Sequence, residues 1–230
     1  STLTGLGLKI TAHSSHGMAA QQVSQAASLL TAGSAQSGLK VEHSALVERL
    51  DGAASVVLAE KDSRVLGVIA LKSFFGDAKC LMSERGYFAL DPSLRGTGAG
   101  QCVWEAMQDI VKKEHLTATL AETLISNYPS LSVQFKEAPA PVVVGFMNLQ
   151  DGRSYALTLS QGAPELALEG ETLEDCKRTL ASQVTVSPTL KRSALHEAIQ
   201  GLPASSFMTP EKRVYIEGRV SGWFGETLVD

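Results

Sequence analysis

The feature that most constrains the fold of this sequence is a run of closely spaced glycines between an extended segment and a helix. The segment reads ALDPSLRGTGAG over residues 89–100, and QCVWEAMQDIVKKEH follows it as an expected helix over residues 101–115. A helix N-terminus carries unpaired backbone N–H groups and the positive end of a dipole, so it attracts anions. Glycines let a ligand approach that backbone closely. The junction therefore indicates a phosphate-binding turn, with Arg95 beside it as a cation.

The spacing of the glycines distinguishes between three phosphate motifs. A P-loop requires Gly-Lys-Ser/Thr, but Gly100 is followed by glutamine and cysteine. A dinucleotide fingerprint would need its last glycine at a position that holds Gln101 or Val103. The pattern R-x-x-G-x-G is satisfied by Arg95, Gly98 and Gly100. A glycine-rich turn without a ligand is the plain alternative.

The rest of the first two thirds of the chain alternates between expected strands and helices. The order is β-α-α-β-β-β-α-β-α-β-β, which predicts a mixed α/β sheet with helices on both faces. We expect helices over residues 16–33, 44–52, 101–115 and 129–138, with Gly33 as a C-cap and Ser44 as an N-cap. We expect strands over residues 7–13, 54–75 (two strands joined by a turn at 61–63), 79–92, 117–124, 141–149 and 153–160.

A loop-like stretch, QGAPELALEGET over residues 161–172, marks a candidate domain boundary. It divides the chain into a domain over residues 1–160 and a C-terminal extension over residues 161–230. The extension carries too much apolar surface for a loose tail. We therefore expect it to pack on the core, as a lid or as the interface of a homodimer.

Three segments of the extension have recognisable patterns. Residues 172–183 and 187–200 are amphipathic, with Thr172 and Ser187 as expected helix caps. Residues 214–229 alternate in character and contain aromatic side chains, which favours a terminal pair of strands.

Composition and charge exclude several classes of function. The 230 residues have a net charge of −4 and no basic run, which gives no support for nucleic-acid or anionic-membrane binding. Apolar runs are shorter than a membrane span and the N-terminal residues lack a signal-peptide pattern, so we expect a cytoplasmic protein, with a mature form whose signal has been removed as the alternative. Cys80, Cys102 and Cys176 are widely spaced, which fits a reducing compartment and offers no disulfide framework. His13 and His16 have no third ligand nearby in the sequence, so we expect no metal site.

The stretch FALDPSLRGTGAGQCVWEAM, residues 88–107, resembles the acyl-CoA pyrophosphate loop of the GNAT superfamily of N-acetyltransferases. In that family an apolar strand end leads through proline into R/Q-x-x-G-x-G/A and a helix. The order of expected elements also fits, and the resemblance covers roughly residues 6–160. It implies a GNAT-like acyl-CoA N-acyltransferase fold with a C-terminal α/β extension. One departure is that many members carry a Y-x-k-x-G-F run near the fourth helix, which SNYPSLSVQFKEAPAPVVVGF lacks.

The resemblance implies acetyl-CoA or another acyl-CoA as a co-substrate. The pantetheine arm would pair with the backbone near Phe88 and Leu90. Asn127 would contact the pantetheine or, equally, only cap a helix. The pyrophosphate would lie on the N–H groups of Arg95, Gly96, Thr97, Gly98, Ala99 and Gly100.

Glu84 is the first candidate for the general base that the implied acyl transfer requires. Strict alternation along its strand places it on the half-buried face of Phe88 and Leu90. Burial would raise the pKa of a carboxyl group there and suit it to accept a proton. The alternative is a solvent-facing carboxylate paired with Arg85 or with a neighbouring strand.

Glu122, near the end of the next strand, is the second candidate base, with a structural ion pair as its alternative. Tyr128 follows that strand, where the family often places the acid that protonates the leaving thiolate; packing is its alternative. The resemblance implies transfer of an acyl group to a small-molecule or peptide amine by direct attack on the thioester. A non-catalytic acyl-CoA-binding or interaction module with the same fold is the second hypothesis, supported by the missing Y-x-k-x-G-F run.

Overall fold

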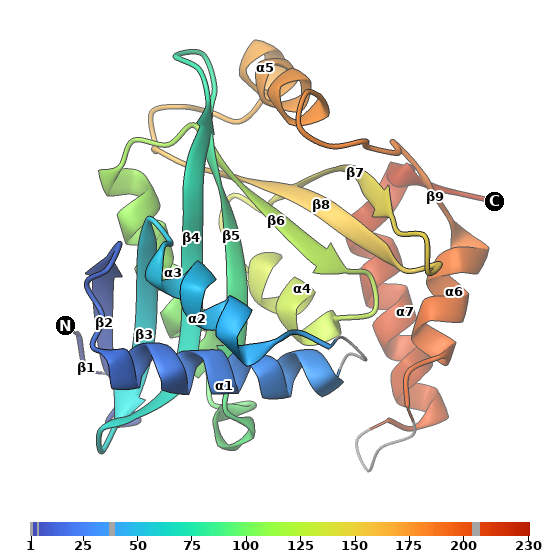
Figure 1. The fold of residues 1–230 in the computed structure, drawn as a ribbon. Helices are drawn as coiled ribbons and strands as arrows, with labels where there is room; N and C mark the ends of the chain where they lie inside the picture. Colours follow the sequence, from blue (N-terminus) through green and yellow to red (C-terminus); the bar gives the residue numbers. More distant parts are fainter. Residues whose placement is uncertain (1, 4, 37–39, 204–207) are drawn as a thin grey trace. The chain divides into compact units, whose positions relative to one another are not determined.

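The computed structural model describes residues 2–3, 5–36, 40–203 and 208–230. It is a mixed α/β structure, as expected from the sequence (Figure 1). Its strand neighbours are mostly antiparallel. The chain divides into two compact units. One comprises Ser1–Thr119 and Gly162–Leu166, and the other comprises Leu120–Gln161 and Ala167–Asp230.

The strands of the first unit form an antiparallel meander, each strand pairing with the next along the chain. The turn expected at 61–63 joins two of them, and Asp62 and Ser63 there adopt φ angles of 50° and 63°. The strands are β1 (Thr2–Leu3), β2 (Lys9–Ser14), β3 (Ser55–Lys61), β4 (Arg64–Gly76) and β5 (Leu81–Leu90).

Helices cover both faces of this meander (Figure 1). α1 (Ala20–Gln36) and α2 (His43–Asp51) pack on one face, over a core that includes Leu58 of β3. α3 (Ala99–Lys113) packs on the other face. We expected α1 to end at Gly33, but the helix continues past it to Gln36. Gly33 lies against β5: a Cβ on it would be 3.8 Å from the Cβ of Ala89. Ser44 lies inside α2, whose N-cap is Glu42, so that expected cap is also wrong.

Strand β5 contains a bulge at Tyr87. Residues 68 and 70 of β4 pair with residues 89 and 86 of β5, so β5 holds one residue more than its partner over this interval. Tyr87 has a φ of 52°, which is unusual for a bulky side chain. A bulge breaks the alternation of side chains along a strand. Residues before and after Tyr87 therefore do not follow one parity.

The second unit combines a small sheet with the C-terminal helices. Its strands follow the order β6-β8-β7, and β7 and β8 form the antiparallel pair expected from the sequence. β9 and β10 form a separate parallel pair. The elements are β6 (Ala118–Leu124, where the boundary between the units falls), α4 (Tyr128–Gln134), β7 (Val142–Asn148), β8 (Ser154–Gln161), α5 (Gly170–Ala181), β9 (Leu190–Lys191), α6 (Arg192–Gln200), α7 (Pro210–Phe224), the 3-10 turn η2 (Gly225–Thr227) and β10 (Leu228–Val229).

The prediction of a terminal strand pair over 214–229 is wrong, because most of this segment is helix α7. Thr209 caps its first turn through its side chain. Ile216, Val220 and Phe224 are buried at a spacing of four residues, which is helical and not strand-like. They share a core with residues from α4, β7 and β8, so the extension packs within the second unit.

The other two segments of the extension form helices as expected, but with different caps. Thr172 lies inside α5, whose N-cap is Glu169. Ser187 precedes α6 but is not its cap, which is Lys191. Instead the backbone N–H and C=O of Ser187 both bond to the backbone of Phe146, at 2.8 Å each. Ser187 therefore extends the sheet edge at β7.

Cys102 is a free thiol, whereas Cys80 and Cys176 are both disulfide-bonded. The expectation that the cysteines form no disulfide is therefore wrong, and the argument from them for a reducing compartment no longer holds. No helix in the described part of the chain is long and apolar enough to cross a membrane. The same residues contain no cluster of three or more histidine, cysteine or acidic side chains arranged to hold a metal ion.

Candidate functional site

Asp91 shapes the turn that links β5 to α3. Its carboxylate accepts hydrogen bonds from the backbone N–H of Ser93 at 2.9 Å and from the hydroxyl of Ser93 at 2.6 Å. These bonds cap the 3-10 turn η1 (Pro92–Leu94) and lower the pKa of Asp91. The turn is thus ordered by a local side chain before any ligand binds.

In residues 95–100, backbone N–H groups that donate a hydrogen bond inside the turn alternate with groups that do not, among the described residues. The N–H groups of Arg95 and Thr97 donate to carbonyl oxygens of η1, at 3.2 and 3.3 Å. The N–H of Ala99 donates to the hydroxyl of Thr97 at 3.3 Å. Within the described residues, the N–H groups of the intervening Gly96, Gly98 and Gly100 have no acceptor. Of the six N–H groups expected to bind a pyrophosphate, three are therefore used inside the turn and three are available.

Gly96 and Gly98 give this turn an open surface. Their φ angles are 75° and 84°, a region that favours glycine, and a Cβ on either would meet nothing within 4 Å. Gly98 is also the N-cap of α3, a helix of 15 residues. A positive helix end with free N–H groups and open space in front of it has the chemistry of an anion site.

Glu84 lies on the face of the sheet that α1 and α2 cover. Its Oε1 accepts a hydrogen bond from Nζ of Lys72 in β4 at 2.5 Å, and its side chain is 19% exposed. Nζ of Lys72 also lies 4.7 Å from the ring centroid of Tyr87. Tyr87 packs against the core beneath α1 and α2, which identifies the face. An ion pair with a neighbouring strand, the alternative for Glu84, is thus present.

Phe88 and Leu90 lie on the opposite face from Glu84. The ring of Phe88 is 5.8 Å from the ring of Trp104 in α3, in an edge-on arrangement. The side chain of Leu90 lies beside Gly67, on the side of the sheet where Val103 of α3 also approaches that glycine. The expectation that all three side chains share one face is wrong, because the bulge at Tyr87 shifts the alternation by one residue.

Arg85 is not the partner of Glu84. It is 3% exposed, and its guanidinium donates to the hydroxyl of Thr119 at 2.9 and 3.1 Å and to the side-chain oxygen of Gln108 at 2.8 Å. The guanidinium also lies 4.2 Å from the ring centroid of Trp104. Arg85 therefore belongs to the packing beneath α3.

Glu122 belongs to the second unit, half-buried in β6. It lies near Tyr155 of β8. Burial raises the pKa of Tyr155, and the negative charge of Glu122 adds to that increase. Glu122 therefore lies in a partly desolvated setting.

Asn127 and Tyr128 are both engaged in packing or capping within the second unit. The side chain of Asn127 accepts a bond from the N–H of Ser130 at 3.4 Å, the helix cap that was one of its two interpretations. The ring of Tyr128 stacks on Trp223 of α7 with centroids 5.6 Å apart. Burial raises the pKa of the Tyr128 hydroxyl, and the neighbouring Tyr215 raises it further. Tyr128 therefore stays protonated at neutral pH.

Lys72 and Tyr87 are the residues near Glu84 that sequence reasoning missed. Lys72 follows the buried Val68 and Ala70 of β4 at intervals of two residues. Alternation along that strand could therefore have placed all three side chains on the face of the sheet that α1 covers. Tyr87 could not have been placed in this way, because its orientation depends on the bulge.

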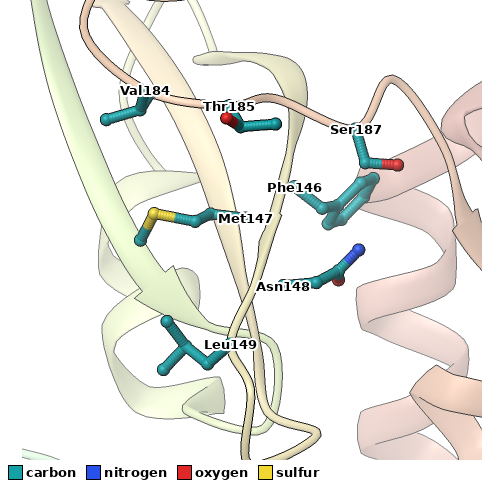
Figure 2. A pocket seen from close by; sticks show the side chains of 7 residues that line it. All are labelled: Phe146, Met147, Asn148, Leu149, Val184, Thr185 and Ser187. Atoms are coloured by element: carbon teal, nitrogen blue, oxygen red, sulfur yellow. The ribbon is translucent and has the colours of Figure 1, made fainter.

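A separate pocket of about 350 Å³ lies in the second unit (Figure 2). Its walls are residues 146–149, at the end of β7, and three residues of the segment 184–187. Gly145 permits the close approach of that segment, since a Cβ there would lie 2.6 Å from the carbonyl oxygen of Ser187. None of the predicted site residues lines this pocket.

Comparison with known proteins gives a match in structure and not in sequence. No protein-family model and no curated protein matches the chain. A chain of the NatC complex bound to Gag peptide and CoA matches with a TM-score of 0.51, 14% identity, and coverage of 66% of this chain and 98% of that one. An acyl-CoA N-acyltransferase from Pseudomonas aeruginosa matches with a TM-score of 0.52, 14% identity, and coverage of 66% and 98%.

A structure from Desulfovibrio desulfuricans assigned to the GNAT family of acetyltransferases also matches, with a TM-score of 0.52, 14% identity, and coverage of 66% and 99%. This chain has the GNAT fold. The fold class expected from the resemblance is therefore confirmed. Each match takes in nearly all of the known chain, so about a third of the present chain adds to the GNAT fold.

Proposed function

We propose that this chain is an acyltransferase that moves an acetyl or related acyl group from acyl-CoA to an amine acceptor. The observation that carries the proposal is the turn before α3. There the N–H groups of Gly96, Gly98 and Gly100 have no acceptor among the described residues, and Gly96 and Gly98 face open space at a positive helix end. This arrangement suits the pyrophosphate of CoA, and it stands where the GNAT resemblance places that group.

The neighbouring residues fit the same ligand. Arg95, exposed at the end of η1, adds a cation able to contact a phosphate. Phe88 and Leu90 occupy the end of β5 that leads into the turn, where the pantetheine arm would pair with the backbone. Asn127, as a helix cap, would contribute through its position only.

The proposed reaction requires one base and one acid. The amine nitrogen attacks the thioester carbonyl carbon, a C–N bond forms, and the C–S bond breaks. Glu84 or Glu122 would take the proton from the ammonium. Tyr128 would give its proton to the departing thiolate and recover one from the nitrogen of the new amide; its pKa, raised by burial, keeps the hydroxyl protonated before the transfer.

The cradle is tested with Gly98→Asn. Asparagine tolerates the φ of 84° better than valine or alanine, and its side chain would enter the open space. Gly152→Asn is the matched control, because Gly152 has a φ of 82° and equally open surroundings. We expect Gly98→Asn to weaken CoA binding by about tenfold or more in calorimetry, or about 1.4 kcal/mol, with Gly152→Asn unchanged. Unchanged CoA affinity in a folded Gly98→Asn protein would overturn the proposal.

The base is tested with Glu84→Gln and Glu122→Gln. The variant that removes the base should keep its CoA affinity and lose turnover by roughly 10²–10⁴-fold. The non-catalytic alternative gains support from the ion pair that already engages Glu84. It predicts that the wild-type chain binds CoA yet releases no thiol from acetyl-CoA with any amine of a panel.

A further inference from the structure

Helix α7 carries two neighbouring stripes of side chains. One stripe is buried in the core of the second unit and ends at Phe224. Tyr215, Arg219 and Trp223 recur at the same spacing of four residues, one position earlier, and therefore lie in a row on the adjoining face of the helix. Tyr215 is 58% exposed and Arg219 is also exposed, so two of these three side chains add little to the core.

Trp223 of this second stripe stacks on two rings of α4. Its ring lies 5.6 Å from that of Tyr128 with the planes at 14°, and 5.0 Å from that of Phe135 with the planes at 4°. The ring of Tyr215 meets Tyr128 edge-on at 6.4 Å. Tyr128 is the first residue of α4, which has only seven residues and is too short to be stable by itself. Contacts with α7 therefore hold the Tyr128 ring in place.

Arg219 adds a positive charge to this aromatic group. Its guanidinium carbon lies 5.3 Å from the ring centroid of Trp223, a cation–π contact that keeps the exposed side chain close to the stack. Burial raises the pKa of the Tyr128 hydroxyl, and Tyr215 adds to that increase. Ser132 of α4 and the positive charge of Arg219 act in the opposite direction. Among the residues that the structure describes, Tyr215 and Arg219 are the titratable or charged groups that act on Tyr128.

The charge of Arg219 matters once Tyr128 gives up its proton. The O–H bond of Tyr128 breaks as the S–H bond of CoA forms, and a phenolate remains until it recovers a proton from the nitrogen of the new amide. Burial disfavours that phenolate, whereas a nearby positive charge stabilises it. A cation beside the stack therefore offsets the cost of using a half-buried tyrosine as an acid.

We infer that Tyr215, Arg219 and Trp223 of α7 are positioning residues for Tyr128. Trp223 and Tyr215 hold its ring, and Arg219 stabilises the phenolate that forms when Tyr128 donates its proton. The inference rests on the proposed acyltransferase function, in which Tyr128 is the acid. It gives the C-terminal extension a role in the reaction beyond completing the core.

The first test changes exposed cations of α7 in the full-length chain. Arg219→Gln removes the charge and Arg219→Lys keeps it. Lys212→Gln is the matched control, because it removes an exposed charge from the first turn of the same helix. The proteins are labelled with 3-fluorotyrosine, and ionisation of Tyr128 is followed by ¹⁹F NMR as the pH is raised. The Tyr128 resonance is assigned by its absence from Tyr128→Phe.

We expect the Tyr128 transition to lie at higher pH in Arg219→Gln than in the wild type, because the phenolate loses a stabilising charge. Arg219→Lys should restore the wild-type transition, and Lys212→Gln should leave it unchanged. Equal transitions in Arg219→Gln and the wild type would overturn the inference. This readout needs neither an acceptor nor turnover.

The second test measures thiol release from acetyl-CoA with a panel of amines. Trp223→Leu should lower kcat by about tenfold or more, as part of the roughly 10²–10⁴-fold that a general acid contributes, with unchanged CoA affinity in calorimetry. Phe135→Leu is the matched control, because it removes the other ring stacked on Trp223 and should keep turnover.

The outcomes of this second test separate the two proposals. No thiol release by the wild type with any amine refutes the acyltransferase. Turnover in the wild type that Arg219→Gln and Trp223→Leu both retain refutes only the role of the α7 residues.

Discussion

At the scale of single residues, short-range hydrogen bonds determine the shape of the turn before α3. Asp91 caps η1, and the hydroxyl of Thr97 donates to the carbonyl oxygen of Leu94 at 2.7 Å. These bonds engage side-chain polar groups of the turn, which would otherwise bind a ligand in competition with the glycine N–H groups. They leave the glycine N–H groups as the available donors.

Asp91→Ala should destabilise the protein in a pH-dependent way. The hydrogen bonds from Ser93 lower the pKa of Asp91 in the folded state. Its contribution is therefore complete above the unfolded pKa, near 4, and is lost as the pH falls through the lower folded pKa. We expect a loss of about 0.5–2 kcal/mol in the free energy of unfolding at pH 7, measured with urea, and a smaller difference from wild type near pH 2.

The control for this prediction is Asp91→Asn, which keeps a capping oxygen without the charge. Its difference from Asp91→Ala should vary little between pH 7 and pH 2. A wild-type advantage over Asp91→Ala that is as large at pH 2 as at pH 7 would contradict the assigned role of the carboxylate.

At the scale of elements, helix α7 packs the C-terminal extension against earlier parts of the second unit. Trp223 stacks on Phe135, with centroids 5.0 Å apart, and on Tyr128. Phe224 meets the ring of Phe146 edge-on at 5.3 Å. The C-terminal end of α7 thus packs against both helix α4 and strand β7.

Phe224→Ala should be strongly destabilising. The side chain is 2% exposed in the core of the second unit, so its removal leaves a cavity. We expect a loss of about 3–5 kcal/mol in the free energy of unfolding by urea. Val214→Ala on the same helix is the control, since Val214 is 68% exposed and should change stability by no more than about 0.5 kcal/mol. Similar urea midpoints of unfolding for Phe224→Ala and Val214→Ala would show that α7 does not pack as described.

At the scale of the whole molecule, the C-terminal extension completes a core that it shares with the strands before it. The second unit begins at Leu120, well before the boundary expected at 160, and continues into the extension. Ile125, Leu131 and Phe146 are buried together with residues of α6 and α7. The extension is therefore an integral part of this unit. Its further role as a lid or a dimer interface stays a prediction.

Truncation after residue 160 should yield a chain that aggregates. It would expose the apolar surface of Ile125, Leu131 and Phe146, which the extension buries. We expect little soluble protein, and oligomers or aggregates in light scattering, whereas the full-length chain remains dispersed. A truncated chain that stays soluble and monomeric, and binds CoA as the full chain does, would show that the extension folds as an independent unit.

The sequence by itself determined the features that depend on neighbours along the chain. Alternation and helical periodicity located the strands and helices of residues 7–160 to within a few residues. The turn at 61–63 and the glycine turn before α3 were predictable because their backbone angles are set by local residues. The stretch around Arg95, Gly98 and Gly100 indicated the GNAT fold through its resemblance to the acyl-CoA loop of that superfamily, and the solved structures confirm this fold.

Only the tertiary structure decided the features that depend on distant partners. The bulge at Tyr87 arises from pairing with β4, so neither the face of Glu84 nor its contact with Lys72 could be read from strand parity. The segment 214–229 has mixed periodicity, and its buried face became evident only from the core against which it packs. Local patterns constrain backbone conformation, but which side chains meet is set by contacts between segments far apart in the chain.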